Sequence, residues 1–142
     1  MANFKQISDG IFIGPQPSEQ DLKEAKRLGI QTVIDMRLPN ESNTSNEEVT
    51  GLNGLDYINI PVDKTALAAH QIDGLEDAME RTSGPYLLHC ATGARAALLL
   101  SLSRARQQGW TAEQTFPEAQ KMGFNLAESE NFAGFVKKIT AP

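Results

Sequence analysis

Residues 86–108, YLLHCATGARAALLLSLSRARQQ, decide the fold class of this chain. The run YLLH at residues 86–89 is typical of a short buried strand. A loop of small residues follows, and we expect a helix from about residue 93 to residue 108, with Gly109 as its stop. Residues 96–102 are apolar on almost every side of that helix, which predicts that it is buried. A buried strand that leads through a tight loop into a buried helix indicates an α/β protein.

Further strands and helices alternate on both sides of this stretch. Strands are expected at residues 4–7, 11–13, 32–34 and 57–62, and helices are expected after Ser18, at residues 70–81, after Thr111 and at about residues 127–139. The first two strands are close enough in sequence to form a hairpin or an edge pair. The polar, acidic stretch of residues 38–54 predicts a loop that holds a short helix. Alternation of this kind predicts a mostly parallel central sheet with helices on both faces.

The length and composition are those of one globular domain, and we expect residues 1–142 to form it. Hydrophobic residues make up 40% and charged residues 22%, which excludes a disordered or fibrous chain. The net charge of −5 disfavours a general nucleic-acid binder, so an anionic ligand needs a local positive site. The single cysteine, Cys90, forms no intramolecular disulfide, and the longest apolar run, residues 96–100, is too short to cross a membrane. These features predict a cytoplasmic protein without a signal peptide.

Three of the predicted strands end in residues that can do chemistry. Ligands of open α/β sheets bind beyond the carboxyl ends of the strands. Asp35 and Arg37 follow one strand, Asp63 follows another, and His89 and Cys90 end the third. The third strand carries the strongest signal, because a cysteine, a glycine and an arginine stand there between a strand and a buried helix.

The loop after Cys90 is suited to hold an oxyanion. The predicted substrate-binding residues are Ala91, Thr92, Gly93, Ala94 and Arg95. Their backbone N–H groups are expected to surround one point at the positive end of the helix, and the Arg95 side chain adds a planar fork for two oxygens. The same surroundings favour the thiolate form of Cys90, which makes it a nucleophile facing the bound oxyanion. A cysteine at a strand end is often only a small buried hydrophobe, but the glycine and the arginine favour the catalytic role.

Other polar residues are expected to support this site or to lie outside it. Asp63 is the candidate general acid, with a solvated loop aspartate as the alternative. We expect His89 to hydrogen-bond the loop and orient the thiol, and Asp35 to be a structural partner of Arg37. A solvated helix face is expected to comprise Ser101, Ser103, Arg104 and Arg106.

Four segments together resemble a known family. They are FIGPQPS at residues 12–18, GIQTVIDMR at 29–37, YINIPVD at 57–63 and HCATGAR at 89–95. The last two resemble the cysteine-dependent phosphatases of dual-specificity type. More closely, the first, second and fourth segments in that order resemble the bacterial phosphatase-like domains of beta-lactamase-hydrolase-like proteins.

The resemblance implies the cysteine-phosphatase fold and a two-step hydrolysis of phosphate monoesters. It implies a phosphocysteine intermediate on Cys90, phosphate binding by Arg95, and acid catalysis by Asp63. Water then hydrolyses the intermediate with Asp63 as the base, and no metal or other cofactor takes part, because the loop and the arginine neutralise the charge. The implied partner is a phosphorylated small molecule or a phosphoprotein, and neither nucleic acid nor a membrane is expected. The sequence specifies no oligomeric state.

Two features depart from the typical phosphatase pattern. Four residues, and not five, separate Cys90 from Arg95, and this loop length is similar to that of rhodanese-type sulfurtransferases. Ala96 replaces the hydroxyl residue that commonly follows the arginine and stabilises the leaving thiolate. Three functions therefore stay open: hydrolysis of phosphotyrosine or a small phenolic phosphate, sulfur transfer through a persulfide on Cys90, and sensing of phosphate or an oxidant by a weakly active module.

Overall fold

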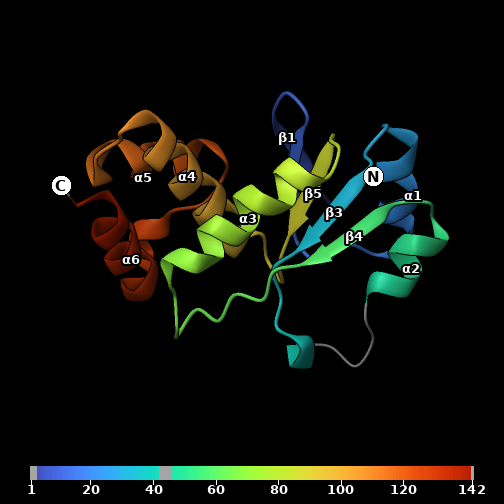
Figure 1. The fold of residues 1–142 in the computed structure, drawn as a ribbon, viewed down its shortest axis with the longest axis horizontal. Helices are drawn as coiled ribbons and strands as arrows, with labels where there is room; N and C mark the ends of the chain where they lie inside the picture. The colour runs from blue at the N-terminus through green and yellow to red at the C-terminus, as the bar shows by residue number, and fades with distance from the viewer. Residues whose placement is uncertain (1–2, 42–45, 142) are drawn as a thin grey trace.

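The computed structural model describes residues 3–41 and 46–141, which contain a five-stranded sheet (Figure 1). Its strands are β1 (Lys5–Ser8), β2 (Ile11–Gly14), β3 (Thr32–Asp35), β4 (Asp56–Asn59) and β5 (Tyr86–His89), in the spatial order β1-β2-β5-β3-β4. Only β1 runs antiparallel to its neighbour, and the other three pairings are parallel. The mostly parallel sheet predicted from the sequence is confirmed.

Helices cover both faces of this sheet. One face carries α1 (Glu19–Arg27) and α2 (Asn46–Leu52), and the other carries α3 (Ala69–Arg81), α4 (Ala94–Gln108), α5 (Ala112–Lys121) and α6 (Glu130–Thr140) (Figure 1). Val33 and Leu87 belong to a small core with Leu22 of α1, whereas Ile34 and Leu88 belong to the large core around α4. Successive strand residues point to opposite faces, so neighbouring residues of β3 and of β5 serve the two cores.

Helix α4 lies inside the large core, as its apolar sequence predicts. All residues from 96 to 102 are buried, and the helix packs against α3, α5 and α6. Two residues predicted to be solvated, Ser101 and Ser103, are also buried. That prediction was wrong for both serines, because the neighbouring helices cover this side of α4. Ser103 Oγ, for example, donates a hydrogen bond to Glu76 of α3 at 2.7 Å.

Most predicted element boundaries agree with the structure to within a few residues. Ser18 caps α1 by accepting a hydrogen bond from the backbone N–H of Asp21 at 3.0 Å. Strand β4 ends three residues earlier than predicted, at Asn59, and the segment beyond it contains Pro61, which has no N–H to donate. The chain nevertheless continues beside β3, because the N–H of Val62 donates to the carbonyl of Met36 at 3.1 Å. Among the described helices, none combines the length and apolarity that a membrane crossing needs.

Candidate active site

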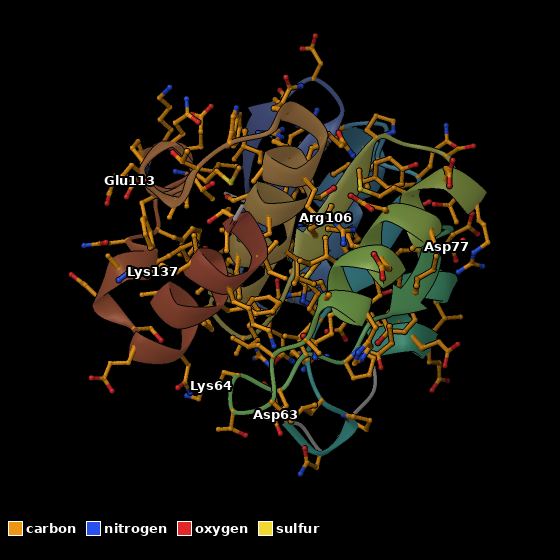
Figure 2. The ribbon with its side chains drawn as sticks, turned by 60° about the vertical axis from the view of Figure 1, so that its left-hand side comes forward. Asp63, Lys64, Asp77, Arg106, Glu113 and Lys137 are labelled. Atoms are coloured by element: carbon orange, nitrogen blue, oxygen red, sulfur yellow. The ribbon has the colours of Figure 1, made fainter. Side chains whose placement is uncertain are left out.

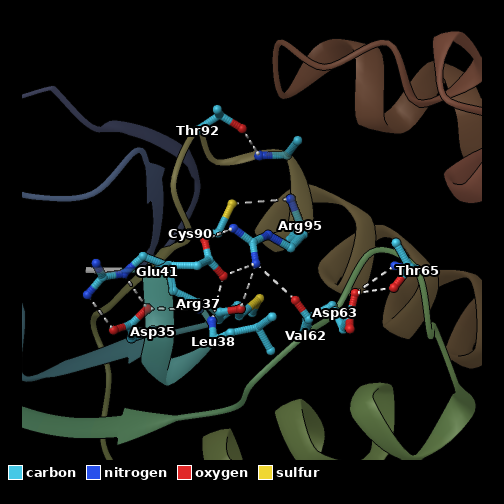
Figure 3. A network of polar contacts seen from close by, with 12 residues as sticks. Asp35, Arg37, Leu38, Glu41, Val62, Asp63, Thr65, Cys90, Thr92 and Arg95 are labelled. Atoms are coloured by element: carbon cyan, nitrogen blue, oxygen red, sulfur yellow. Dashed lines mark hydrogen bonds and ion pairs between the residues drawn. The ribbon is translucent and has the colours of Figure 1, made fainter. Parts of the chain in front are cut away.

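The loop between β5 and α4 wraps around the sulfur of Cys90 (Figure 3). Sγ accepts hydrogen bonds from the backbone N–H groups of Gly93, at 3.0 Å, and Arg95, at 3.3 Å. Gly93 caps α4 with a φ of 102°, a left-handed conformation that favours glycine. The turn therefore brings two of the predicted N–H donors and the positive end of α4 to the cysteine, which is buried.

The guanidinium of Arg95 is held by three neighbouring groups, one of which is the carbonyl oxygen of Met36, which accepts a hydrogen bond from Nη1 at 3.5 Å. Its Nη1 donates to the carbonyl oxygen of Val62 at 2.9 Å and to Oε2 of Glu41 at 2.6 Å, and its Nη2 donates to Oε1 of Glu41 at 2.7 Å. The hydrogen bonds to Glu41 raise the pKa of Arg95, and the nearby Cys90 sulfur raises it further. Conversely, Arg95 lowers the pKa of Glu41. Both groups of this pair are therefore charged near neutral pH.

Glu41 was not among the residues predicted for the site. It lies in a one-turn 3-10 helix, Pro39–Glu41, at the start of the acidic stretch. The N–H of Leu38 donates to Oε2 of Glu41 at 2.6 Å, and the N–H of Glu41 donates to the carbonyl of Leu38 at 3.1 Å. A proline followed by an asparagine indicates a turn here. No local pattern, however, indicates that this carboxylate meets an arginine 54 positions later.

Asp63 lies in the loop after β4, at the same end of the molecule as Lys64 (Figure 2). Its Oδ1 accepts hydrogen bonds from the N–H of Thr65 at 2.8 Å and from the Thr65 hydroxyl at 2.6 Å. These hydrogen bonds lower the pKa of Asp63, because they stabilise the carboxylate form.

A cavity of about 560 Å³ collects most of the predicted site residues. Those that line it are Asp63, Ala91, Thr92, Ala94 and Arg95. Cys90 and Gly93 are buried within the turn of the loop and do not line it. Glu41 and Lys64 add charged walls, and Leu38 and Phe132 add apolar ones. The structure thus brings the Cys90 loop and the Asp63 loop to one cavity.

Asp35 forms a buried polar cluster beside this site. Its two carboxylate oxygens accept hydrogen bonds from Nε and Nη2 of Arg37, at 3.0 and 2.9 Å, and Oδ2 also accepts from the hydroxyl of Tyr57 at 2.7 Å. Burial alone raises the pKa of Asp35, but these hydrogen bonds and the neighbouring charges outweigh it and lower the pKa. The predicted structural pairing of Asp35 with Arg37 is confirmed.

His89 does not form the predicted hydrogen bond to the loop. Its side chain is fully buried, and neither ring nitrogen has a hydrogen-bond partner among the described residues. His89 pairs in register with Asp35, so both side chains lie on one face of the sheet, whereas Cys90 belongs to the core on the other face. Burial lowers the pKa of His89 to about 4, although Asp35, with Oδ1 at 3.8 Å from Nδ1, partly opposes this effect.

No metal site accompanies these residues in the parts of the chain that the structure describes. Residues 3–41 and 46–141 contain no group of three or more histidine, cysteine, aspartate or glutamate side chains placed to hold an ion.

The sheet order and the loop around Cys90 define the class of α/β proteins that contains the tyrosine and dual-specificity phosphatases. Within that class, the chain belongs to the family of the phosphatase-like domain of beta-lactamase hydrolase-like proteins, whose model matches residues 3–107. A beta-lactamase hydrolase-like protein of Xylella fastidiosa (strain Temecula1) is 26% identical over 128 residues, which are 87% of this chain and 30% of that protein. This chain therefore spans less than a third of that curated relative.

Solved structures show the same fold. A candidate phosphatase from Neisseria meningitidis Z2491 superimposes with a TM-score of 0.80 at 26% identity, covering 98% of this chain and 99% of that one. TpbA of Pseudomonas aeruginosa, solved in complex with pTyr, superimposes with a TM-score of 0.75 at 18% identity, covering 95% of this chain and 83% of that one. The chain is thus phosphatase-like in both family and fold.

Proposed function

We propose that this chain is a cysteine-dependent phosphoric-monoester hydrolase that acts through a phosphocysteine intermediate on Cys90. The observation that carries the proposal is the pair of N–H groups, from Gly93 and Arg95, that converge on Sγ at the start of α4. Donors aimed at a sulfur stabilise a thiolate, which is the nucleophilic form of cysteine. The Arg95 guanidinium beside it is suited to bind the phosphoryl group.

In the first step, the Cys90 thiolate attacks phosphorus and the ester P–O bond breaks. The leaving oxygen takes a proton from the Asp63 carboxyl, which lines the same cavity. The backbone N–H groups of the loop and the Arg95 side chain stabilise the charge on the phosphoryl oxygens. The products of this step are a free alcohol or phenol and phosphocysteine.

In the second step, a water molecule attacks the phosphocysteine. Asp63, now a carboxylate, takes a proton from that water, the P–S bond breaks, and inorganic phosphate leaves. Cys90 departs as a thiolate, which the N–H groups of Gly93 and Arg95 stabilise. Ala96 supplies no hydroxyl to this leaving sulfur, so we expect the second step to be slow.

The walls of the cavity favour a phosphate ester with an apolar group, such as phosphotyrosine or a small phenolic phosphate. The volume of about 560 Å³ falls in the range of ligand pockets and exceeds what a phosphate alone fills. Leu38 and Phe132 supply apolar surface, while the charges of Arg95 and Lys64 are balanced by those of Glu41 and Asp63. This balance disfavours heavily charged polyanions. The complex of TpbA with pTyr supports the same substrate class.

The test is an assay of para-nitrophenyl phosphate hydrolysis between pH 5 and 8. We expect Cys90→Ser to abolish phosphate release and Asp63→Asn to reduce it by about a hundredfold or more. Asp9→Asn is the matched control, because Asp9 is an exposed aspartate in the turn between β1 and β2, which lies at the opposite end of the sheet from the carboxyl ends of the parallel strands. Unchanged hydrolysis by Cys90→Ser would contradict the proposal.

The length of the loop favours a second candidate function, sulfur transfer. Four residues separate Cys90 from Arg95, as in rhodanese-type loops, and a persulfide on Cys90 requires no acid for a leaving group. Formation of thiocyanate from thiosulfate and cyanide tests this function. Thiocyanate formation that depends on Cys90 and is unaffected by Asp63→Asn, without phosphatase activity, would assign the protein to the sulfurtransferases.

A further inference from the structure

The guanidinium of Arg95 has two edges, and Glu41 occupies only one of them. A guanidinium carries five N–H groups in a plane. The two on Nη1 donate to Glu41 and to the carbonyls of Val62 and Met36, and one on Nη2 donates to the other oxygen of Glu41. The remaining two, on Nε and Nη2, have no oxygen acceptor among the described residues. These two N–H groups point from the same edge, at the spacing that binds two oxygens of an oxyanion.

We propose that Glu41 is a positioning residue: it holds the Nη1–Nη2 edge of Arg95 so that the Nε–Nη2 edge is presented to the phosphate. This inference rests on the proposed function and assigns to it a residue from outside the Cys90 loop. Glu41 does not touch the phosphate in this arrangement, and it acts only through Arg95.

The free edge of Arg95 lies toward the cysteine. The Cys90 sulfur contributes to the raised pKa of Arg95, so the two groups are close enough to interact. The backbone N–H of the same arginine donates to Sγ at 3.3 Å (Figure 3). A phosphoryl group attached to the sulfur therefore meets the side chain of Arg95 at the edge that Glu41 leaves open.

Glu41 is itself held in place, which a positioning residue requires. The N–H of Leu38 donates to the Oε2 atom that Arg95 also contacts. The Arg95 and Glu41 side chains are only 12% and 24% exposed, so solvent screens this pair less than a surface ion pair. A flexible arginine loses rotamer freedom when it binds a ligand, and an arginine already fixed by a carboxylate loses less.

If Glu41 instead blocked Arg95, removal of its carboxylate would change the affinity for phosphate in the opposite direction. If the carboxylate were a competitor that blocks Arg95, its removal would strengthen the binding of phosphate. If Glu41 positions Arg95, its removal weakens that binding. The affinity for inorganic phosphate therefore decides between the two roles.

The experiment is a calorimetric titration of inorganic phosphate into the wild-type chain, Glu41→Gln and the control Glu48→Gln. Glu48 is exposed on α2, so its substitution makes the same change of charge in the same acidic stretch. We expect Glu41→Gln to raise the Kd by roughly tenfold to a hundredfold and Glu48→Gln to leave it unchanged. An unchanged or lower Kd for Glu41→Gln would overturn the assignment.

A double-mutant cycle separates positioning from a loss of folding. Lysine has no second edge for a carboxylate to hold, so Glu41→Gln is expected to have little further effect on the Kd when Arg95 is replaced by Lys. Additive effects would overturn the assignment, because they would mean that Glu41 does not act through Arg95.

Hydrolysis of para-nitrophenyl phosphate is measured in parallel. A wild-type chain that neither binds nor releases phosphate overturns the proposed function together with this inference, whereas normal binding by Glu41→Gln overturns the inference alone.

Discussion

Gly93 and Phe124 are packed so closely that no side chain fits between them. A Cβ atom on Gly93 would lie 2.7 Å from Cζ of Phe124 and 3.3 Å from the carbonyl oxygen of Gly14. The φ of Gly93, 102°, is also one that other residues rarely adopt. The loop around Cys90 therefore depends on this glycine for both its conformation and its packing.

The first prediction follows from this contact. We expect Gly93→Ala to lower the free energy of unfolding by about 2 kcal/mol or more and to reduce phosphate release at least tenfold. Gly109→Ala is the matched control, because Gly109 ends the same helix with a φ of 72° and has no neighbour within 4 Å of its added Cβ. Its cost is the backbone strain alone, about 1 kcal/mol. Urea unfolding and the phosphatase assay measure both effects, and equal losses in the two variants would contradict the packing argument.

The second prediction concerns the pH dependence of hydrolysis. The Thr65 hydroxyl donates to Asp63 and helps to lower its pKa, so the protonated form that acts as the acid is lost earlier as the pH rises. Thr65→Val removes this hydrogen bond, raises the pKa of Asp63, and is expected to move the alkaline limb of the kcat profile to higher pH. The matched control is Thr82→Val, at the end of α3. A limb that moves to lower pH, or does not move, would refute Asp63 as the acid.

The third prediction concerns the stability of the fold in acid. The folded-state pKa of His89, about 4, lies below the ordinary value of 6.5, so between these values the unfolded chain binds one more proton than the folded chain. Stability from this group is therefore present above pH 6.5 and is lost as the pH falls toward 4. We expect His89→Phe to remove about 2 kcal/mol of the decrease in unfolding free energy between pH 7 and pH 5.

Urea unfolding at the two pH values checks this prediction. His70→Gln is the control, because His70 is the second histidine of the chain and is exposed. If wild type and His89→Phe lose the same stability between pH 7 and pH 5, His89 is not the group responsible.

The fourth prediction concerns the buried cluster of Asp35. Asp35→Asn removes the charge that Arg37 and Tyr57 contact and leaves a guanidinium without its partner in the core. We expect a loss of about 3 kcal/mol in the free energy of unfolding. Replacing Arg37 by Leu in the same chain should recover part of this loss, because no unpaired charge then remains. Asp56→Asn, an exposed position on β4, is the control for the urea measurement.

Much of the fold was predictable because hydrophobic pattern and local turn chemistry determine it. The strand at residues 86–89 and the buried helix after it agree with the sequence prediction, since both depend on short-range apolar patterns. The carboxyl end of β4 was harder to predict, because the proline at position 61 ends the regular strand while the chain continues beside β3. The prediction of one domain over residues 1–142 stays a prediction, because the curated relatives are more than three times as long as the matched segment.

The site was predictable only as far as one segment defines it. Cys90, the loop and Arg95 are contiguous, so their meeting around one point could be expected from the sequence. Glu41 reaches Arg95 through tertiary packing, and its neighbours Glu47 and Glu48 look the same in sequence. His89 was assigned to the loop by its proximity to Cys90, but the alternation of side chains along β5 directs it away.

The burial of α4 couples the cavity to the whole molecule. The helix that begins at the Cys90 loop is enclosed by α3, α5, α6 and the sheet, so its buried residues 96–102, which follow the loop directly, cannot open while the core stays closed. Amide hydrogens of this buried segment should then exchange with solvent only through global unfolding. An oxyanion bound at the Cys90 loop would stabilise every cooperative unit of the protein at once. The protection of amide hydrogens against exchange would then rise as much in β3 or α3 as beside the ligand.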